Sequence, residues 1–265
     1  MRLFGAIFRA IWVVAIVTIP SLLLASASQG SLEFSLIIGG IVGIFTVFEY
    51  GSESPGFVDF RFAPPYNRFR AFTLAIQITA ITLVCRAVEL DIQNAPILEW
   101  AQQAAVALDF PGSPVAQTVD LLIEDATFSD TSAILLVLTA SVSFAVGFSL
   151  TFLFSSFLWI FNWPVDRANF NLWINLPMFQ PSESMAVPNR LRRDAIINIV
   201  LAVVLIYALP YALKYGSDLL TADILNSNQA MVWVTTLWVF VPSTLLARSA
   251  AMWKIARIIR RAQFR

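Results

Sequence analysis

Long apolar stretches alternate with short polar segments along the chain, and six of the stretches are long enough to cross a bilayer. A membrane-spanning helix needs about 20 mainly apolar residues, because each residue adds about 1.5 Å to a helix and the hydrocarbon core is about 30 Å thick. The stretches cover residues 3–24, 34–50, 71–90, 133–163, 195–213 and 230–246. The pattern therefore predicts an all-α membrane protein, a polytopic helical bundle of about six transmembrane helices that forms a single integral membrane domain over residues 1–265.

The fourth stretch, residues 133–163, is longer than the hydrocarbon core requires. We expect this span to tilt, to bend near Gly147 or to extend beyond the lipid.

Arginine and lysine residues gather in the segments on one side of the expected bundle. They stand before or early in the first span, between the second and third, between the fourth and fifth, and after the sixth; only Arg86 and Lys214 lie elsewhere. The segment between the third and fourth spans carries acidic residues and no basic one. Because loops rich in lysine and arginine stay in the cytoplasm, we expect both termini to be cytoplasmic. The expected location is the inner or plasma membrane, as a multi-pass membrane protein.

The first apolar stretch has a second interpretation. Two early arginines, an apolar core and the sequence Ala25-Ser26-Ala27 are also typical of a secretory signal peptide with its cleavage site. Cleavage would remove residues 1–27 and leave five spans, without changing the orientation of the rest. The length of the apolar run favours a retained span.

Residues 91–131, on the extracytoplasmic side, also have a helical pattern. Pro96 and Pro114 each stand near the start of a run whose apolar residues recur at helical spacing. We expect two short amphipathic helices that cover the bundle, or alternatively an acidic surface that docks a cationic partner or solute.

Residues 249–265 have basic and apolar side chains on opposite faces of a helix. The basic face consists of Lys254, Arg257, Arg261 and Arg265. An amphipathic helix of this kind on the cytoplasmic side is expected to lie among the headgroups and to bind membrane lipid, anionic lipid in particular. One short basic face beside a membrane is better explained by phospholipid than by nucleic acid, so no nucleic-acid partner is expected.

Composition agrees with a lipid environment and excludes several kinds of chemistry. Hydrophobic residues make up 58% of the chain and charged residues 13%, and the mean hydropathy is +0.74, outside the range of ordinary soluble domains. The chain has no histidine and one cysteine, Cys85. These counts exclude His-ligated metals, a histidine general base, a thiolate cluster and an intramolecular disulfide. We expect no metal and no cofactor, while the many aromatic side chains leave room for a bound quinone, pigment or lipid.

One group of polar side chains falls inside an expected span. Thr79, Thr82, Arg86 and Glu89 lie within a narrow arc of the helix over residues 71–90. Arg86 and Glu89 are close enough along the helix to pair, and Arg86 can also extend to the headgroups. Because charged residues in lipid often mark functional sites, this arc is also a candidate site for an anionic solute or headgroup.

Small residues recur every four positions in two of the expected spans. They are Ser35, Gly39 and Gly43 in the second, and Thr139, Ser143, Gly147, Thr151 and Ser155 in the fourth. Such ridges let helix backbones approach closely in lipid. We expect both ridges to pack within the chain, and the alternative is that one of them contacts another subunit.

The preferred functional hypothesis is a non-catalytic integral membrane subunit or assembly factor of a larger membrane complex, because intramembrane polar residues are sparse and catalytic motifs are lacking. The alternative is a permease or transport subunit for a small solute or lipid, with a path past Thr79, Thr82 and Arg86. A third hypothesis, a lipid-handling enzyme or flippase-like protein, rests on the amphipathic helices.

Overall fold

Helices make up nearly all of the described chain. The computed structural model describes residues 2–53, 56–92, 94–123, 129–161, 163–164, 170–177, 179, 187–216 and 227–263. Six of the helices are long and apolar enough to cross a membrane. They are α1 (Arg2–Leu23), α2 (Gln29–Gly51), α3 (Tyr66–Glu89), α6 (Asp130–Ile160), α8 (Val187–Gly216) and α9 (Asn228–Gln263). The expectation of a helical bundle with six long apolar helices is confirmed, and the fold fits a multi-pass membrane protein.

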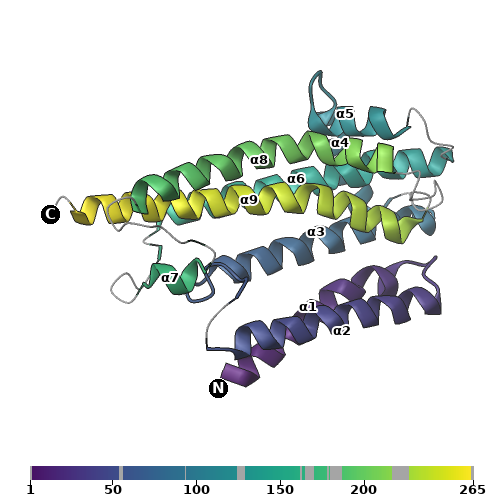
Figure 1. Ribbon diagram of the computed structural model, residues 1–265. Coiled ribbons are helices and arrows are strands. Elements are labelled where there is room, and N and C mark those ends of the chain that lie inside the picture. Colours follow the sequence, from purple (N-terminus) through teal and green to yellow (C-terminus); the bar gives the residue numbers. More distant parts are fainter. Residues whose placement is uncertain are drawn as a thin grey trace.

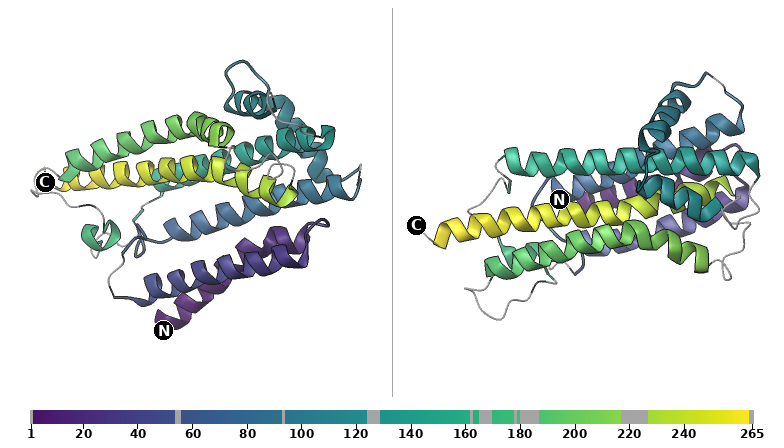
Figure 2. Two further views of the ribbon diagram at one scale, coloured as in Figure 1. Left: turned by 45° about the vertical axis from the view of Figure 1, so that its right-hand side comes forward. Right: turned by 90° about the horizontal axis from the view of Figure 1, so that it is seen from above.

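Helix α9 lies at the centre of the bundle, packed against α8, α6 and α3. Figures 1 and 2 show α1 and α2 as a hairpin on one side, where α1 packs on α3. Both ends of the described chain lie at the same end of the bundle (Figure 1). We call this the terminal end, and the opposite end, where α4 and α5 lie, the distal end.

The short helices α4 (Pro96–Leu108) and α5 (Pro114–Ile123) form the segment that the prolines indicated. Each begins at a proline, whose missing N–H and fixed φ suit the first helical position. Gly112, with φ of 86°, makes the turn between them, a conformation that glycine adopts at little cost. α4 packs on α6 and α3, and α5 packs on α8 and α6. The two helices thus cover the distal end of the bundle.

Serine residues begin two of the long helices. The Ser28 hydroxyl accepts a hydrogen bond from the Ser31 backbone N–H at 3.1 Å, and the Ser129 hydroxyl accepts one from Ser132 at 3.1 Å. Each bond satisfies an N–H that a helix start leaves without a partner. From Ser129, α6 runs for 31 residues without interruption through Gly147, about 46 Å at 1.5 Å per residue.

The separate surface helix expected over residues 249–265 is not formed, because α9 continues through Gln263 as one helix of 36 residues. Nothing in the sequence around Arg248 interrupts a helix. The apolar face that was expected to meet lipid is instead covered by protein: Met252, Ile255 and Ala256 are at most 2% exposed. They belong to a core cluster with residues of α3, α6 and α8 and with Trp163. This part of α9 therefore belongs to the bundle.

Candidate functional site

A polar cluster joins α3, α6 and α9 in the middle of the bundle. The Gln77 amide Nε2 donates to the Ser143 hydroxyl at 2.6 Å and lies 3.4 Å from the Thr236 carbonyl. The Ser143 hydroxyl in turn donates to the Thr235 carbonyl at 2.6 Å. Gln77, Ser143 and Thr236 are fully buried. These hydrogen bonds connect three of the long helices to one another.

Three buried polar oxygens on the same interface have no hydrogen-bond partner within the described residues. They are Gln77 Oε1, Thr236 Oγ1 and Thr73 Oγ1. A buried polar atom without a partner costs roughly 1–3 kcal/mol. Such atoms are the places in this interface where a hydrophilic molecule would gain most from binding.

Glu89 joins the turn between α1 and α2 to α3 and α9 at the distal end. Its carboxylate accepts hydrogen bonds from the Ala25 N–H at 2.7 Å, from the Asn228 amide at 2.5 Å and from the Ser26 hydroxyl. Arg86 donates to the Leu23 carbonyl at the end of α1. These two described residues therefore do not form the ion pair that their spacing allowed, since each has partners on neighbouring helices or turns.

The two threonines of the expected polar arc do not share a site. Thr82 is fully buried, and its hydroxyl donates to the Ile78 carbonyl of its own helix at 2.7 Å. Thr79 instead lines an apolar groove between α1 and α3. The arc of Thr79, Thr82, Arg86 and Glu89 is thus divided among a groove, a helix backbone and two distal contacts.

The groove between α1 and α3 has a volume of about 430 Å³. Aromatic and aliphatic side chains line it, and Thr79 contributes its one hydroxyl. The larger residues are Trp12, Ile16, Ile19, Phe72, Ile76, Leu83 and, from α4, Ile97. The Trp12 and Phe72 rings meet edge to face, with centroids 5.8 Å apart. A smaller apolar pocket of about 240 Å³ lies beside Pro210, among α5, α6, α8 and α9. The linings of both are almost entirely apolar and therefore suit hydrocarbon better than a hydrophilic solute.

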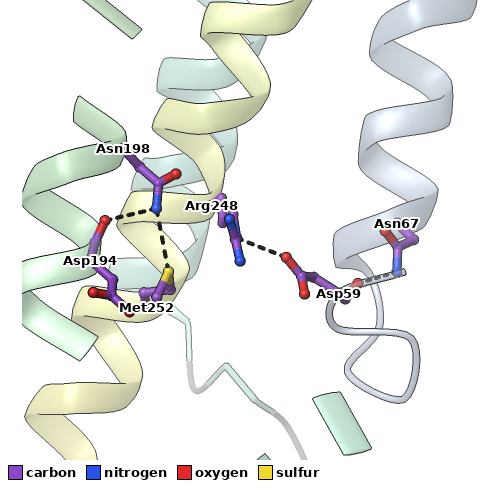
Figure 3. A network of polar contacts seen from close by, with 6 residues as sticks. All are labelled: Asp59, Asn67, Asp194, Asn198, Arg248 and Met252. Atoms are coloured by element: carbon purple, nitrogen blue, oxygen red, sulfur yellow. Dashed lines mark hydrogen bonds and ion pairs between the residues drawn. The ribbon is translucent and has the colours of Figure 1, made fainter. Parts of the chain in front are cut away.

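An ion pair joins the segment before α3 to α9 at the terminal end. Arg248 Nε lies 2.7 Å from Asp59 Oδ2, while the Asn67 amide donates to the Asp59 backbone carbonyl at 2.7 Å (Figure 3). Burial raises the pKa of the Asp59 carboxyl above 3.8, and the charges of Arg248 and Arg70 oppose this rise without cancelling it. The ionised carboxylate is therefore less favourable here than in water, although it has an arginine partner.

The same close view shows how α8 and α9 meet beside this pair. The Asn198 amide donates to the Asp194 backbone carbonyl at 2.8 Å and lies 3.7 Å from the Met252 sulfur (Figure 3). Asn175, in the short helix α7 (Leu172–Asn175), accepts a hydrogen bond from the Phe62 N–H at 3.1 Å. These contacts hold the segments between the long helices against the terminal end.

Cationic side chains at the terminal end pack on aromatic rings. Arg9 lies 4.7 Å from the Tyr50 ring centroid, and Lys254 and Arg257 lie 5.5 Å and 5.4 Å from the Trp159 ring. Arg261 is exposed, and Arg265 lies outside the described residues. Within the expected basic face, Lys254 and Arg257 thus have a ring on α6 as a neighbour.

The two ridges of small residues pack inside the chain, on different neighbours. Gly39 and Gly43 of α2 face Val14 of α1, and Ser35 accepts a hydrogen bond from the Gln229 amide. Ser143 and Gly147 of α6 face α3 and α9. Thr139 and Thr151 are also buried, whereas Ser155, at the end of the ridge, is half-buried.

Comparison with protein-family models, with curated proteins and with solved structures finds no match for this chain. The function is therefore inferred from the geometry alone.

Sequence reasoning missed the cluster around Gln77 and the pair of Asp59 with Arg248. A signal for the first was present, since Gln77 is the one amide within the apolar stretch over residues 71–90. The pair of Asp59 with Arg248 had no signal in the sequence, because the two residues lie in distant parts of the chain and only the fold brings them together.

Proposed function

We propose that this chain is a non-catalytic integral membrane subunit, or an assembly factor, of a larger membrane complex. It spans the inner or plasma membrane with its terminal end in the cytoplasm. Gln77, Arg86 and Glu89, three strongly polar residues within the long helices, each join neighbouring parts of the bundle. This use of polar groups supports a structural role, in which a rigid bundle presents its outer faces to other membrane proteins.

The exposed side of helix α2 is the main support for this proposal. Apart from a hydrogen bond from Gln229 to Ser35, α2 packs closely on α1 alone among the described helices. The side of α2 turned away from α1 is apolar and exposed along its length, with Ile37, Ile41, Phe45 and Phe48 between 47% and 71% exposed. A span with one neighbour inside its own chain offers the largest area for a helix of another subunit.

Purification of the tagged full-length chain from its native membrane in a mild detergent tests the proposal. We expect a stoichiometric protein partner in the same peak. Because Gly39, Gly43 and Gly147 face helices of the same chain, the decisive substitution is Ile41→Trp on the exposed face of α2. Val200→Trp on α8, also at an exposed apolar position, is the matched control. The I41W variant should lose the partner and the V200W variant should keep it. A lone wild-type protein, or equal retention by both variants, would contradict the proposal.

A transport role is the second candidate, supported by the buried oxygens of Thr73, Gln77 and Thr236 that have no partner within the described residues. They lie on one interface, between α3 and α9, and would bind a permeating hydrophilic molecule. In this case cysteines placed at Thr73 and Thr236 should react with a membrane-impermeant thiol reagent. Absence of labelling from either side would exclude this path.

A further inference from the structure

The groove between α1 and α3 continues toward a group of arginines at the terminal end. Trp12 and Phe72 stand at the end of the groove nearest the chain terminus. One turn further along α1, Arg9 lies over the Tyr50 ring at 4.7 Å. Arg70, two residues before Phe72, is close enough to act electrostatically on both Tyr50 and Asp59. The apolar groove and the two arginines, Arg9 and Arg70, thus lie next to each other.

Neither Arg9 nor Arg70 forms a direct ion pair with a carboxylate in the described part of the chain. Arg9 is exposed and donates to the Gly5 carbonyl of its own helix at 2.7 Å. The Nε of Arg70 is buried without a hydrogen-bond partner. The nearby carboxylates have other partners: Glu49 accepts from the N–H groups of Gly56 and Val58, and Asp59 pairs with Arg248. An anion would therefore complement this end of the groove.

The dimensions of the groove suit one leaflet of a bilayer. From Phe72 to Leu83, α3 rises about 16 Å at 1.5 Å per residue, roughly half of the 30 Å hydrocarbon core. The groove is almost entirely apolar, and two of its lining residues, Phe72 and Ile76, are exposed at the surface of the bundle. A fatty acyl chain fits this shape, and a phosphate attached to it would lie level with Arg9 and Arg70.

We propose that the groove between α1 and α3 binds one acyl chain of an anionic phospholipid, whose phosphate is held by Arg9 and Arg70 beside Tyr50. The lipid comes from the leaflet at the terminal end. This site does not depend on the presence of a partner subunit, since all of its residues belong to one chain. The bound lipid fills the interface that connects the α1–α2 hairpin to the rest of the bundle.

Native mass spectrometry of the delipidated, detergent-purified full-length protein tests the site. It is titrated with phosphatidylglycerol or with phosphatidylcholine of the same acyl chains. We expect one phosphatidylglycerol to bind per chain, more tightly than phosphatidylcholine. The double substitution Arg9→Gln with Arg70→Gln should weaken phosphatidylglycerol binding about tenfold, to the level of phosphatidylcholine. Ala15→Phe, which fills the groove, should weaken the binding of both lipids.

The charge-matched control is Arg192→Gln with Arg193→Gln, two arginines at the terminal end of α8, a helix that does not line the groove. This control should bind phosphatidylglycerol as the wild type does. Equal affinity for the two lipids, an equal loss in the control, or unchanged binding by A15F would overturn the proposal. Displacement of the lipid by millimolar inorganic phosphate would also overturn it, because it would identify a site for the free anion.

A second measurement on the native sequence keeps the test decisive if the double arginine variant does not fold. Phosphatidylglycerol with brominated acyl chains should quench the fluorescence of Trp12, which lines the groove. The contribution of Trp12 is the part of the quenched emission that is missing in Trp12→Phe. Equal quenching in the wild type and W12F would place the acyl chain elsewhere and overturn the proposal.

Discussion

Arg248 on α9 pairs with Asp59, which stands before α3, at 2.7 Å between Nε and Oδ2. The two partners are not equally important for stability, because burial makes the ionised form of Asp59 unfavourable even with the arginine present. Loss of Arg248 leaves a buried negative charge without its ion-pair partner, whereas loss of the Asp59 charge leaves an arginine that is partly exposed.

Arg248→Gln is therefore expected to lower the free energy of unfolding near neutral pH by about 1–3 kcal/mol. Asp59→Asn should cost clearly less, and the double variant should recover most of the loss caused by R248Q. Thermal unfolding in detergent measures all three. A cost for D59N as large as that for R248Q would show that the ion pair, rather than the buried carboxylate, determines stability at this position.

The pKa of Asp59 predicts a specific pH dependence. Because the folded pKa is raised above 3.8, the folded chain binds this proton more tightly than the unfolded chain. The stabilisation that comes from protonated Asp59 is fully present at pH values below the pKa of the unfolded chain. It is lost as the pH rises through the pKa of the folded chain. The thermal midpoint of the wild type minus that of D59N should therefore fall as the pH rises from 3.8, because only the wild type has this carboxyl. A difference that stays constant or grows with pH would contradict this assignment.

Gly147 is expected to resist any larger side chain. A Cβ at this position would lie 2.5 Å from Val239 Cγ1, whereas a Cβ at Gly40 would meet nothing within 4 Å. Gly147→Ala should destabilise the bundle by about 1–3 kcal/mol, and Gly40→Ala should be close to neutral. Val239→Ala removes the opposing atom, so V239A should restore part of the stability of G147A. Purely additive thermal unfolding data for the two substitutions would contradict this close contact.

Gln77→Leu is expected to cost little despite the complete burial of the side chain. Ser143 keeps its hydrogen bond to the Thr235 carbonyl, and the variant also removes the partnerless Gln77 Oε1. Hydrogen bonds between membrane helices contribute about 0.6 kcal/mol on average, so a loss near this value is expected in thermal unfolding. Thr79→Val, in the groove, is the control. A loss of several kcal/mol in Q77L would mean that the cluster is a major determinant of the fold.

The proposed orientation can be tested with single introduced cysteines, because the native Cys85 is fully buried and should not react. Gln102 on α4 and Arg193 on α8 are both exposed, at opposite ends of the bundle. An impermeant maleimide added outside intact cells should label Gln102→Cys and not Arg193→Cys, and inverted vesicles should give the reverse. The opposite result would place the terminal end outside the cytoplasm.

The six long helices could be predicted from the sequence because span length depends only on local apolar runs. The ends of these helices were harder to predict, and the apolar run of residues 230–246 is only part of a helix of 36 residues. An apolar run indicates which residues can lie in lipid, but it does not indicate where the helix ends. The spacing of Gly39 and Gly43 predicted a packing face, but a spacing cannot name the neighbour, which in the structure is Val14 of α1.

The polar contacts were the least predictable part. The spacing of Arg86 and Glu89 permitted a local pair, yet Glu89 binds the turn after α1 and Asn228 of α9. Backbone N–H groups after a helix end and a distant amide compete with a neighbour on the same helix, and only the fold determines which of them come near.

The position of Gln77 also has a consequence for the nascent chain. In the proposed membrane protein this amide enters the bilayer with α3, whereas the Ser143 hydroxyl of α6 that accepts its hydrogen bond follows 66 residues later. At about 5–20 residues per second, synthesis of the intervening chain takes roughly 3–13 s. During this interval the amide must face lipid, the translocon or a chaperone. A ribosome that stalls before α6 is made would therefore expose a polar group that quality-control factors can recognise.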